Sequence, residues 1–394
     1  MTFPATDGIT DRLQALFAYD ASSPLIFSSG LFLFLFAGFL LVYSVFRRAP
    51  MARIVYVIAF SLYFYYKSSG IYFLLLVFAA ASDFLIARGI YRARFRWTKR
   101  WLVVLSVAVN LGMLGYFKYT NFLIDISNQL FGQGFLQFQN IFLPVGISFF
   151  VFQSMSYTID IYRGQLKPLS NWLDYLFYLS FFPQLVAGPI VRARDFIPQI
   201  RQNPVVVTRE MFGTGVFLIL TGLFKKAIIS DYISLNFVDR IFDEPLLYSG
   251  FECLMGIYGY ALQIYCDFSG YSDMAIGLAL LLGFRFPKNF DAPYHSATIT
   301  EFWRRWHISL SMWLRDYLYI SLGGNRKGRL RTYFNLLVTM VLGGLWHGAA
   351  IRFVLWGTLH GVALALHKLW LSVVPGAKVS GYQMHPLSRL AGIL

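Results

Sequence analysis

The sequence predicts an all-α, polytopic membrane protein. Hydrophobic residues make up 57% and charged residues 13% of its 394 residues, whereas a soluble globular domain carries about 25% charged residues. The aromatic content of 19% suits a surface that faces both acyl chains and the amphipathic membrane interface. Apolar runs also recur along the chain at roughly the 20-residue length that crosses about 30 Å of hydrocarbon.

Eleven apolar segments are candidate membrane spans. They centre on residues 25–46, 52–66, 71–87, 101–117, 141–160, 172–190, 211–229, 251–268, 270–284, 333–350 and 353–370. Several are short for a full crossing, so we expect about ten membrane helices together with interfacial or re-entrant helices. The sequence has no internal repeat, low-complexity tract or linker to a soluble domain, and residues 1–394 are therefore predicted to form a single membrane domain.

The net charge of +15 is concentrated in short loops between the apolar segments. Arg47, Arg48 and Arg53 follow the first segment, and Arg88, Arg92, Arg94, Arg96, Lys99 and Arg100 follow the third. Both loops fall on one side of the membrane by parity, and Arg163 and Lys167 after the fifth segment agree. Basic loops are retained in the cytoplasm, so this side is predicted to be cytoplasmic. No separate basic domain exists, and nucleic acid is not indicated as a partner.

The N-terminal segment is predicted to lie outside the cytoplasm. It carries more acidic than basic residues: Asp7, Asp11 and Asp20 against Arg12. The start "MTFPATDGITDRLQALFAYD" has no basic stretch before its apolar run, so it does not resemble a cleavable signal peptide. We therefore expect the first span to be retained.

Several kinds of site are not supported by the sequence. Cys253 and Cys266 lie within or beside one apolar stretch and have no CxxC spacing, so neither a disulfide framework nor a zinc site is indicated, and no metal is expected. The HExxH and GxSxG motifs are absent, as is the HxxxxD dyad of many glycerolipid acyltransferases.

The stretch "EFWRRWHISLSMWLRDYLYISLGGNRKGRLR" (301–331) contains the most polar chemistry. Phe302, Trp306, Leu310, Trp313 and Tyr317 share one helical face, and Arg304, His307, Ser311 and Arg315 share another. These spacings predict an amphipathic helix that lies in the interface or lines a cavity. An interfacial anchor whose arginines hold anionic lipid head groups is the alternative.

His347 lies within a predicted span, where a polar ring costs free energy unless it has a partner. The basic loop 323–331 is expected to be cytoplasmic, and His347 follows about 21 Å along the next helix. The pair Gly343–Gly344 and the single Gly348 predict a break or kink nearby, which is tolerated only where protein or a water-filled cavity covers it. We therefore expect a cavity with a titratable ring at its base; a histidine packed against a carbonyl is the alternative.

A neutral imidazole can remove a hydroxyl proton, and its ordinary pKa near 6.5 suits that task. No activated serine or cysteine nucleophile is evident. Direct transfer of an acyl group from an activated donor, with His347 and His307 as catalytic residues, is therefore compatible with the residues present. A proton-coupled transporter and a lipid enzyme are compatible with them as well. His360 is interpreted as a packing residue or a partner of the site. His295, His367 and His385 are interpreted as loop or interface residues.

Five stretches, taken together, resemble the membrane-bound O-acyltransferases, and specifically the branch with the alginate O-acetyltransferase membrane subunit and its peptidoglycan and cellulose counterparts. They are "LPVGISFFVFQSMSYTIDIYRG" (143–164), "SFFPQLVAGPIVR" (180–192), "YCDFSGYSDMAIGLALLLGFRFPKNFDAPY" (265–294), "EFWRRWHISLSMWLRDYLYISLGGNRKG" (301–328) and "GGLWHGAAIRFVLWGTLHG" (343–361). The stretches occur in family order and cover most of residues 141–370.

The resemblance implies a family fold with a central tunnel, in which a cytoplasmic donor meets an acceptor from outside. His347 matches the family's essential histidine, and His307 matches a second polar position that faces the same reaction chamber. Arg304, Arg305 and Arg315 are candidates to bind the anionic donor, an acetyl-CoA or acyl-carrier thioester, with no resident cofactor. The branch also leads us to expect further apolar helices after the position of Leu394.

The resemblance favours an inner-membrane O-acetyltransferase component for an exported polysaccharide, with an alginate-like polymer as the favoured acceptor. The implied partners are the lipid bilayer, the acetyl donor, the polysaccharide and an extracytoplasmic SGNH-like acetyltransferase. Acetylation of peptidoglycan or cellulose and D-alanyl transfer to teichoic acid are alternatives within the enzyme class. A conduit that moves an acyl group or lipid without catalysis is the alternative outside it.

Overall fold

The computed structural model describes residues 17–132 and 134–374, and every regular element in these residues is helical. The helices gather into two compact units. The first contains the described residues up to 107 together with 144–188 and 192–285, and the second contains residues 108–143, 189–191 and 286 onward. The predicted all-α class is confirmed. The acidic N-terminal residues Asp7 and Asp11, with Arg12, and the distal His385 lie outside the described residues.

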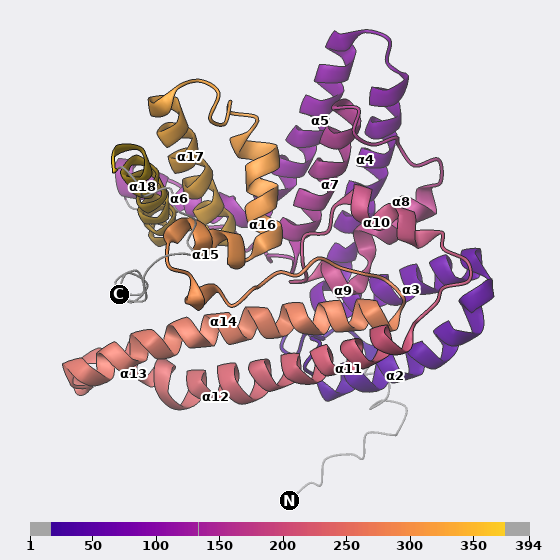
Figure 1. Ribbon diagram of the computed structural model, residues 1–394, viewed down its shortest axis with the longest axis horizontal. Coiled ribbons are helices and arrows are strands. Elements are labelled where there is room, and N and C mark those ends of the chain that lie inside the picture. The colour runs from indigo at the N-terminus through magenta and orange to yellow at the C-terminus, as the bar shows by residue number, and fades with distance from the viewer. Residues whose placement is uncertain (1–16, 133, 375–394) are drawn as a thin grey trace, which may run out of the picture. The chain divides into compact units, whose positions relative to one another are not determined.

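The first unit combines long apolar helices with short ones (Figure 1). Its helices are α2 (Gly30–Val45), α3 (Pro50–Ser69), α4 (Phe73–Arg92), the start of α5 (Arg96–Leu114), α7 (Ile147–Tyr162), α8 (Trp172–Ser180), α9 (Phe182–Leu185), α10 (Ala193–Ile200), α11 (Arg209–Leu223), α12 (Asp231–Ile233), α13 (Asp239–Asp243) and α14 (Gly250–Leu281). Polar caps start several of these helices: Ser29 accepts from the Phe32 amide, and Ser249 and Glu252 form a reciprocal capping box at α14. Such caps satisfy amides that lack a partner within the helix.

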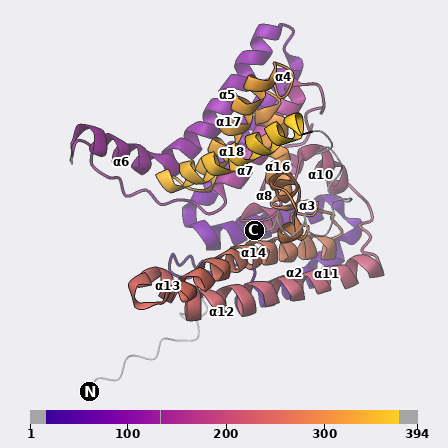
Figure 2. The same cartoon turned by 60° about the vertical axis from the view of Figure 1, so that its left-hand side comes forward.

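Two helices of the first unit, α11 and α14, run side by side in both views (Figures 1 and 2). Small residues permit this approach, because a Cβ atom at Gly222 would lie 2.5 Å from the Gly270 carbonyl oxygen. The predicted separate spans 251–268 and 270–284 are therefore wrong. Gly270 lies inside one continuous 32-residue helix, where it serves helix packing rather than chain reversal.

Four helical segments among the described residues are long and apolar enough to cross a bilayer. They are Gly30–Arg48, Pro50–Arg92, Arg96–Phe131 and Arg209–Asp243. On α2, Phe34, Leu41 and Val45 are each about three-quarters exposed, at 76%, 74% and 77%, as expected of side chains that face lipid. The polytopic class is confirmed, whereas the count of about ten membrane helices stays a prediction.

Two further predictions about the first unit are wrong. The predicted span 172–190 is not one helix: α8 ends at Ser180, and Pro183 lies in the first turn of the four-residue α9. Proline cannot continue a helix but is well placed at its start. Arg53, which the charge pattern assigned to a loop, is 1% exposed within α3 and donates to the backbone carbonyls of Ile200 and Gln202.

The second unit holds the C-terminal end of α5 and five further helices. They are α6 (Thr120–Phe131), α15 (Ile299–Arg305), α16 (Ile308–Trp313), α17 (Arg329–His347) and α18 (Ile351–Val373), with π-helical turns at Gly115–Tyr119 and Leu314–Tyr319. The helices α17 and α18 form a close pair. A Cβ atom at Gly344 would lie 2.2 Å from the Phe353 carbonyl oxygen, so this pair needs glycine at the crossing.

The break predicted near His347 occurs at Gly348, whereas no break occurs at the Gly343–Gly344 pair. The helix α17 continues through Gly343 and Gly344 and ends at His347, with Gly348 as its C-terminal cap, so the glycine pair provides packing rather than a kink. The amphipathic helix predicted within 301–331 is interrupted, because α15 ends before Trp306 and α16 begins after His307. The physical reason for this break lies in the candidate site.

Candidate active site

His307 occupies a corner between two short helices. Its φ of 40° and ψ of 56° are left-handed, a conformation that costs a residue with a Cβ atom on the order of 1 kcal/mol and persists where neighbours enforce it. Asn289 enforces it here. Its carbonyl accepts from the Ile308 amide at 2.9 Å, and its side-chain oxygen accepts from the Ser309 hydroxyl at 2.9 Å. The Ser309 hydroxyl in turn accepts from the Ile190 amide at 3.0 Å.

The corner turns the His307 side chain into the protein, where it is fully buried at 0% exposure. The ring lies 6.4 Å from that of Phe290, nearly parallel to it, and 5.8 Å from that of Trp346. Packing by aromatic rings leaves His307 few orientations. The imidazole is therefore positioned before any substrate arrives.

His347 is the last residue of α17, and its side chain is exposed. Two side chains of the Gly115–Tyr119 turn hold this helix end. Lys118 donates to the Trp346 carbonyl, and the Tyr119 hydroxyl donates to the Leu345 carbonyl at 2.7 Å. The last carbonyls of a helix have no partner within it, so these contacts both satisfy the backbone and fix the turn that carries His347.

The two histidines face one another within the second unit. Their ring centres are 6.4 Å apart, and their planes are tilted by 60°. This separation is too long for a direct hydrogen bond between the imidazoles, yet a hydroxyl or carbonyl group between them could contact both. The His347 ring also lies edge-on to Trp346 and Trp356, at 5.0 and 5.3 Å. A buried and an accessible imidazole thus lie among the rings of Phe290, Trp346 and Trp356, which we call the aromatic frame.

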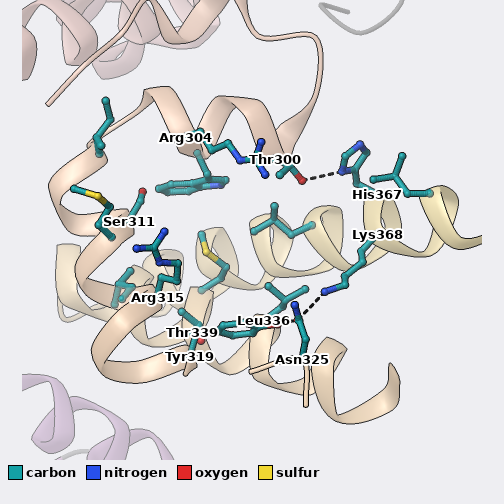
Figure 3. A pocket seen from close by; sticks show the side chains of 17 residues that line it. Thr300, Arg304, Ser311, Arg315, Tyr319, Asn325, Leu336, Thr339, His367 and Lys368 are labelled. Atoms are coloured by element: carbon teal, nitrogen blue, oxygen red, sulfur yellow. Dashed lines mark hydrogen bonds between the residues drawn. The ribbon is translucent and has the colours of Figure 1, made fainter. Parts of the chain in front are cut away.

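A cavity of about 800 Å³ adjoins this frame in the second unit (Figure 3). Its apolar wall comes from Trp303, Ile308, Met312, Leu314, Leu336, Met340, Leu364 and Leu371, and its polar wall from Thr300, Arg304, Ser311, Arg315, Tyr319, Asn325, Thr339, His367 and Lys368. Met340 is seven residues before His347 on α17, or about 10 Å along the helix. Trp303 links the cavity wall to Trp356, 5.7 Å away, and so to the frame around His347.

The cavity wall is strongly basic. Arg304 forms no ion pair with any residue between 17 and 374 that the structure describes. Lys368 donates to the Asn325 side-chain oxygen at 2.8 Å rather than to a carboxylate, whereas Arg315 is paired with Asp316 at 2.6 Å. Figure 3 shows Arg304 near Thr300, and His367 and Lys368 on α18. An apolar cleft with surplus cations suits an amphipathic anion.

Comparisons with known proteins show which family the chain is similar to. A family model for the membrane-bound O-acyltransferases matches residues 162–387, which include both histidines and the cavity. The probable alginate O-acetylase AlgI of Pseudomonas aeruginosa is 43% identical over 352 residues, covering 87% of this chain and 66% of that protein. The chain belongs to the membrane-bound O-acyltransferase family. The predicted resemblance is thereby confirmed.

Other relatives of this O-acyltransferase have names that indicate different substrates. The peptidoglycan O-acetyltransferase of Helicobacter pylori is 36% identical over 375 residues, covering 88% of this chain and 71% of that protein. The teichoic acid D-alanyltransferase of Bacillus subtilis is 29% identical over 248 residues, covering 59% of this chain and 60% of that protein. The chain thus spans about two thirds of the length of the curated relatives it matches.

The structure separates the three candidate donor-binding arginines of this O-acyltransferase. Arg304 and Arg315 line the cavity, and Arg305 does not. The guanidinium of Arg305 binds the Glu301 carboxylate at 2.8 Å and also donates to the Asp291 carbonyl at 3.3 Å. These contacts join α15 to the preceding loop, so Arg305 is placed in a supporting contact rather than in the cavity.

Of two further histidines, one packs against aromatic rings and the other lines the cavity. His360 packs against Phe302, Trp303 and Trp356, with the nearest ring centre 4.5 Å away, which fits a packing residue. His367 is not a loop residue, because it lies within α18, lines the cavity and bonds the Thr300 hydroxyl at 2.8 Å.

Sequence analysis missed Lys118 and Tyr119, which lie more than 220 residues from their partners on α17. The one available signal was a lysine at the end of an apolar run. The residues that the structure describes hold no group of three or more histidine, cysteine or acidic side chains placed to bind a metal ion.

Proposed function

We propose that this O-acyltransferase transfers an acetyl group from a cytoplasmic thioester to hydroxyl groups of an exported polysaccharide. It would act in the bacterial inner membrane with its N-terminus outside the cytoplasm. The observation that carries the proposal is the accessible His347 facing the buried His307, beside a cavity in which Arg304 has no ion pair. The proposed general base, the positioning group and the anion-binding site therefore all lie in the second unit.

In the proposed reaction, His347 removes the proton from the acceptor hydroxyl. The oxygen then attacks the thioester carbonyl, the carbon–oxygen bond forms and the carbon–sulfur bond breaks. The imidazolium returns its proton to the departing thiolate, so the enzyme ends in its starting state. His307, held by its backbone corner, positions or polarises the reacting groups. No covalent acyl-enzyme is needed.

The cavity is the proposed binding place for the donor. Acetyl-CoA and the phosphopantetheine arm of an acyl carrier share anionic phosphates and a long, less polar chain. Arg304 and Lys368 would bind the phosphates, with Arg315 contributing less because Asp316 already balances it. The apolar wall would bind the chain and direct the thioester toward His347.

An alginate-like polymer is the favoured acceptor, because the alginate O-acetylase relatives combine 43% identity with coverage of 87% of the chain. Peptidoglycan remains the second candidate on the strength of the Helicobacter pylori relative. Delivery to the polymer would involve an extracytoplasmic partner of the SGNH-like acetyltransferase class.

The test is thioester cleavage by purified protein in nanodiscs with labelled acetyl-CoA or acetylated carrier. His347→Ala should lower the rate by about 10²- to 10⁴-fold, the range expected for a general base. His295→Ala is the matched control, since His295 is an exposed histidine at the end of a short 3-10 helix, outside the cavity. Full activity in His347→Ala would reject the assignment. Donor binding that is never followed by cleavage would favour the conduit.

Acceptor class needs a second measurement. The chain is expressed in an alginate-producing host that lacks its own membrane acetylase, and the O-acetyl content of the secreted polymer is determined. Restored acetylation that depends on His347 supports the alginate assignment. Acetylation of peptidoglycan in the same cells, without acetylated polymer, would move the assignment to the second candidate.

A further inference from the structure

A second basic cavity lies in the first unit, and neither His307 nor His347 belongs to that unit. It has a volume of about 410 Å³ and is lined by Arg94, Arg96, Lys99, Tyr162 and Arg163. The first three residues come from the loop between α4 and α5 and from the first turn of α5, and the last two from the end of α7. Because α4 packs against α7, two basic segments far apart in sequence form one concave site.

Three of the four cations in this cavity lack an ion pair with the described residues. Arg94, Arg96 and Lys99 form no ion pair with any residue in the ranges 17–132 and 134–374. The first turn of α5 holds no acidic residue, although the N-terminus of a helix favours anions and disfavours cations. These cations therefore do not stabilise their own helix. A bound anion would balance both the side chains and the helix end.

Aromatic residues indicate the depth of this cavity in the membrane. Trp97 and Trp101, on the same part of α5, are 64% and 57% exposed, with ring centres 5.5 Å apart. Exposed tryptophans collect at the level of the lipid head groups. Further along α5, Val104 and Leu105 are about half exposed, at 53% and 49%, as expected where hydrocarbon begins. The loop residue Phe95 is 75% exposed and suits shallow insertion.

We propose that this cavity binds the phosphate head group of an anionic glycerophospholipid, such as phosphatidylglycerol. Arg94, Arg96 and Lys99 supply charge that no ion pair balances, and the Tyr162 hydroxyl can bond a phosphate or glycerol oxygen. The lipid is favoured over a soluble anion because lipid phosphates are always present at the depth of the tryptophans. The bound lipid would join the α4–α5 loop to the end of α7. This binding does not depend on acyl transfer.

The first test needs no variant. Native mass spectrometry of the protein in neutral detergent counts bound lipids during titration with short-chain phosphatidylglycerol, phosphatidylcholine of the same chains, or glycerol phosphate. The proposal predicts tight binding of phosphatidylglycerol that weakens as ionic strength rises. Equal binding of phosphatidylcholine would overturn it. Equal binding of glycerol phosphate would also overturn it, because the site would then be one for a soluble anion.

The second test removes the charges of the cavity. The triple variant Arg94→Gln, Arg96→Gln, Lys99→Gln leaves Tyr162 and Arg163 in place. Its affinity for phosphatidylglycerol should fall on the order of a hundredfold, since each cation near an anionic lipid contributes to binding.

A charge-matched control variant completes the design. It is Arg326→Gln, Lys327→Gln, Arg329→Gln, which removes the same charge from an exposed turn and from the first residue of α17. These three residues line neither basic cavity. The control should keep the affinity for phosphatidylglycerol of the unmodified protein. An equal loss in both variants would show that net charge alone attracts the lipid, and would overturn the proposal.

Discussion

Replacing Arg304 by glutamine tests the proposed donor site most directly. Arg304 lies on α15 and lines the cavity of about 800 Å³, and it has no carboxylate partner among the described residues. Its positive charge is therefore available to an anionic donor. Glutamine keeps most of the length of the side chain and its hydrogen-bonding capacity but removes the charge, so the change isolates the electrostatic contribution.

The magnitude follows from the exposure of the side chain. A hydrogen bond to a charged group contributes about 1.5–3 kcal/mol when shielded from water, and less when solvent and salt screen it. Since Arg304 is exposed, about 1–2 kcal/mol is reasonable, which raises the KM for the donor roughly five- to thirtyfold. The kcat should change little, because Arg304 does not contact the reacting carbonyl. The effect should shrink at high ionic strength.

Arg305→Gln is the matched control, one residue away in the same dipeptide. Its guanidinium already binds the Glu301 carboxylate at 2.8 Å and lies outside the cavity. The Arg305 variant should lower thermal stability slightly and leave the KM for the donor unchanged. Arg315→Gln should give an intermediate increase, since Asp316 lies 2.6 Å from its guanidinium.

The assay is the initial rate of thioester cleavage against donor concentration at two salt concentrations. Two results would refute the reasoning. An unchanged KM in Arg304→Gln would remove that arginine from the donor site. An equal increase of KM in the Arg304 and Arg305 variants would show that the cavity does not distinguish the two arginines, so the donor would bind elsewhere.

Two further predictions concern the helix that carries His347. Gly344→Ala should lower the melting temperature, because its Cβ atom would lie 2.2 Å from a carbonyl oxygen of α18 and overpacking costs about 1–3 kcal/mol. The control Gly112→Ala should leave the melting temperature unchanged, since no atom lies within 4 Å of the added Cβ atom. Equal melting temperatures of the two variants would contradict the close α17–α18 contact. Tyr119→Phe should lower kcat several-fold without changing the KM for the donor, since it removes one hydrogen bond to the end of α17 worth about 1 kcal/mol. The control Tyr116→Phe, at an exposed tyrosine, should leave kcat unchanged. Equal kcat values in the two variants would contradict a positioning role of Tyr119.

The sequence predicted the helices well because an apolar run in a membrane chain has few alternatives to a helix. It failed where a break depends on distant residues. The corner at His307 is held by Asn289 and by the Ile190 amide, and neither contact leaves a trace in the local pattern. The Tyr119 hydroxyl meets the Leu345 carbonyl 226 positions away, which periodicity alone cannot reveal.

The candidate site residues also differ in how far the sequence could place them. Motif resemblance singled out His307 and His347 together, and the structure places their ring centres 6.4 Å apart. Their catalytic roles stay predictions. The arginines were grouped by charge alone, and only three-dimensional packing separates Arg304, in the cavity, from Arg305, in an ion pair. The single-domain organisation and the central tunnel also stay predictions.

The left-handed corner lets one short segment carry both an exposed arginine and a buried histidine. In an unbroken helix, Arg304, His307 and Ser311 would lie on one face, and the imidazole would point toward the same surface as the guanidinium. The break at His307 changes this. Arg304 and Ser311 still line the cavity, whereas His307 is turned away and buried beside Trp346. A neutral base or positioning group works best away from cations, because nearby positive charge and phosphate both perturb it. A conformational cost on the order of 1 kcal/mol thus places the Arg304 side chain in the cavity and buries the His307 ring beside Trp346, although the two residues are only three positions apart.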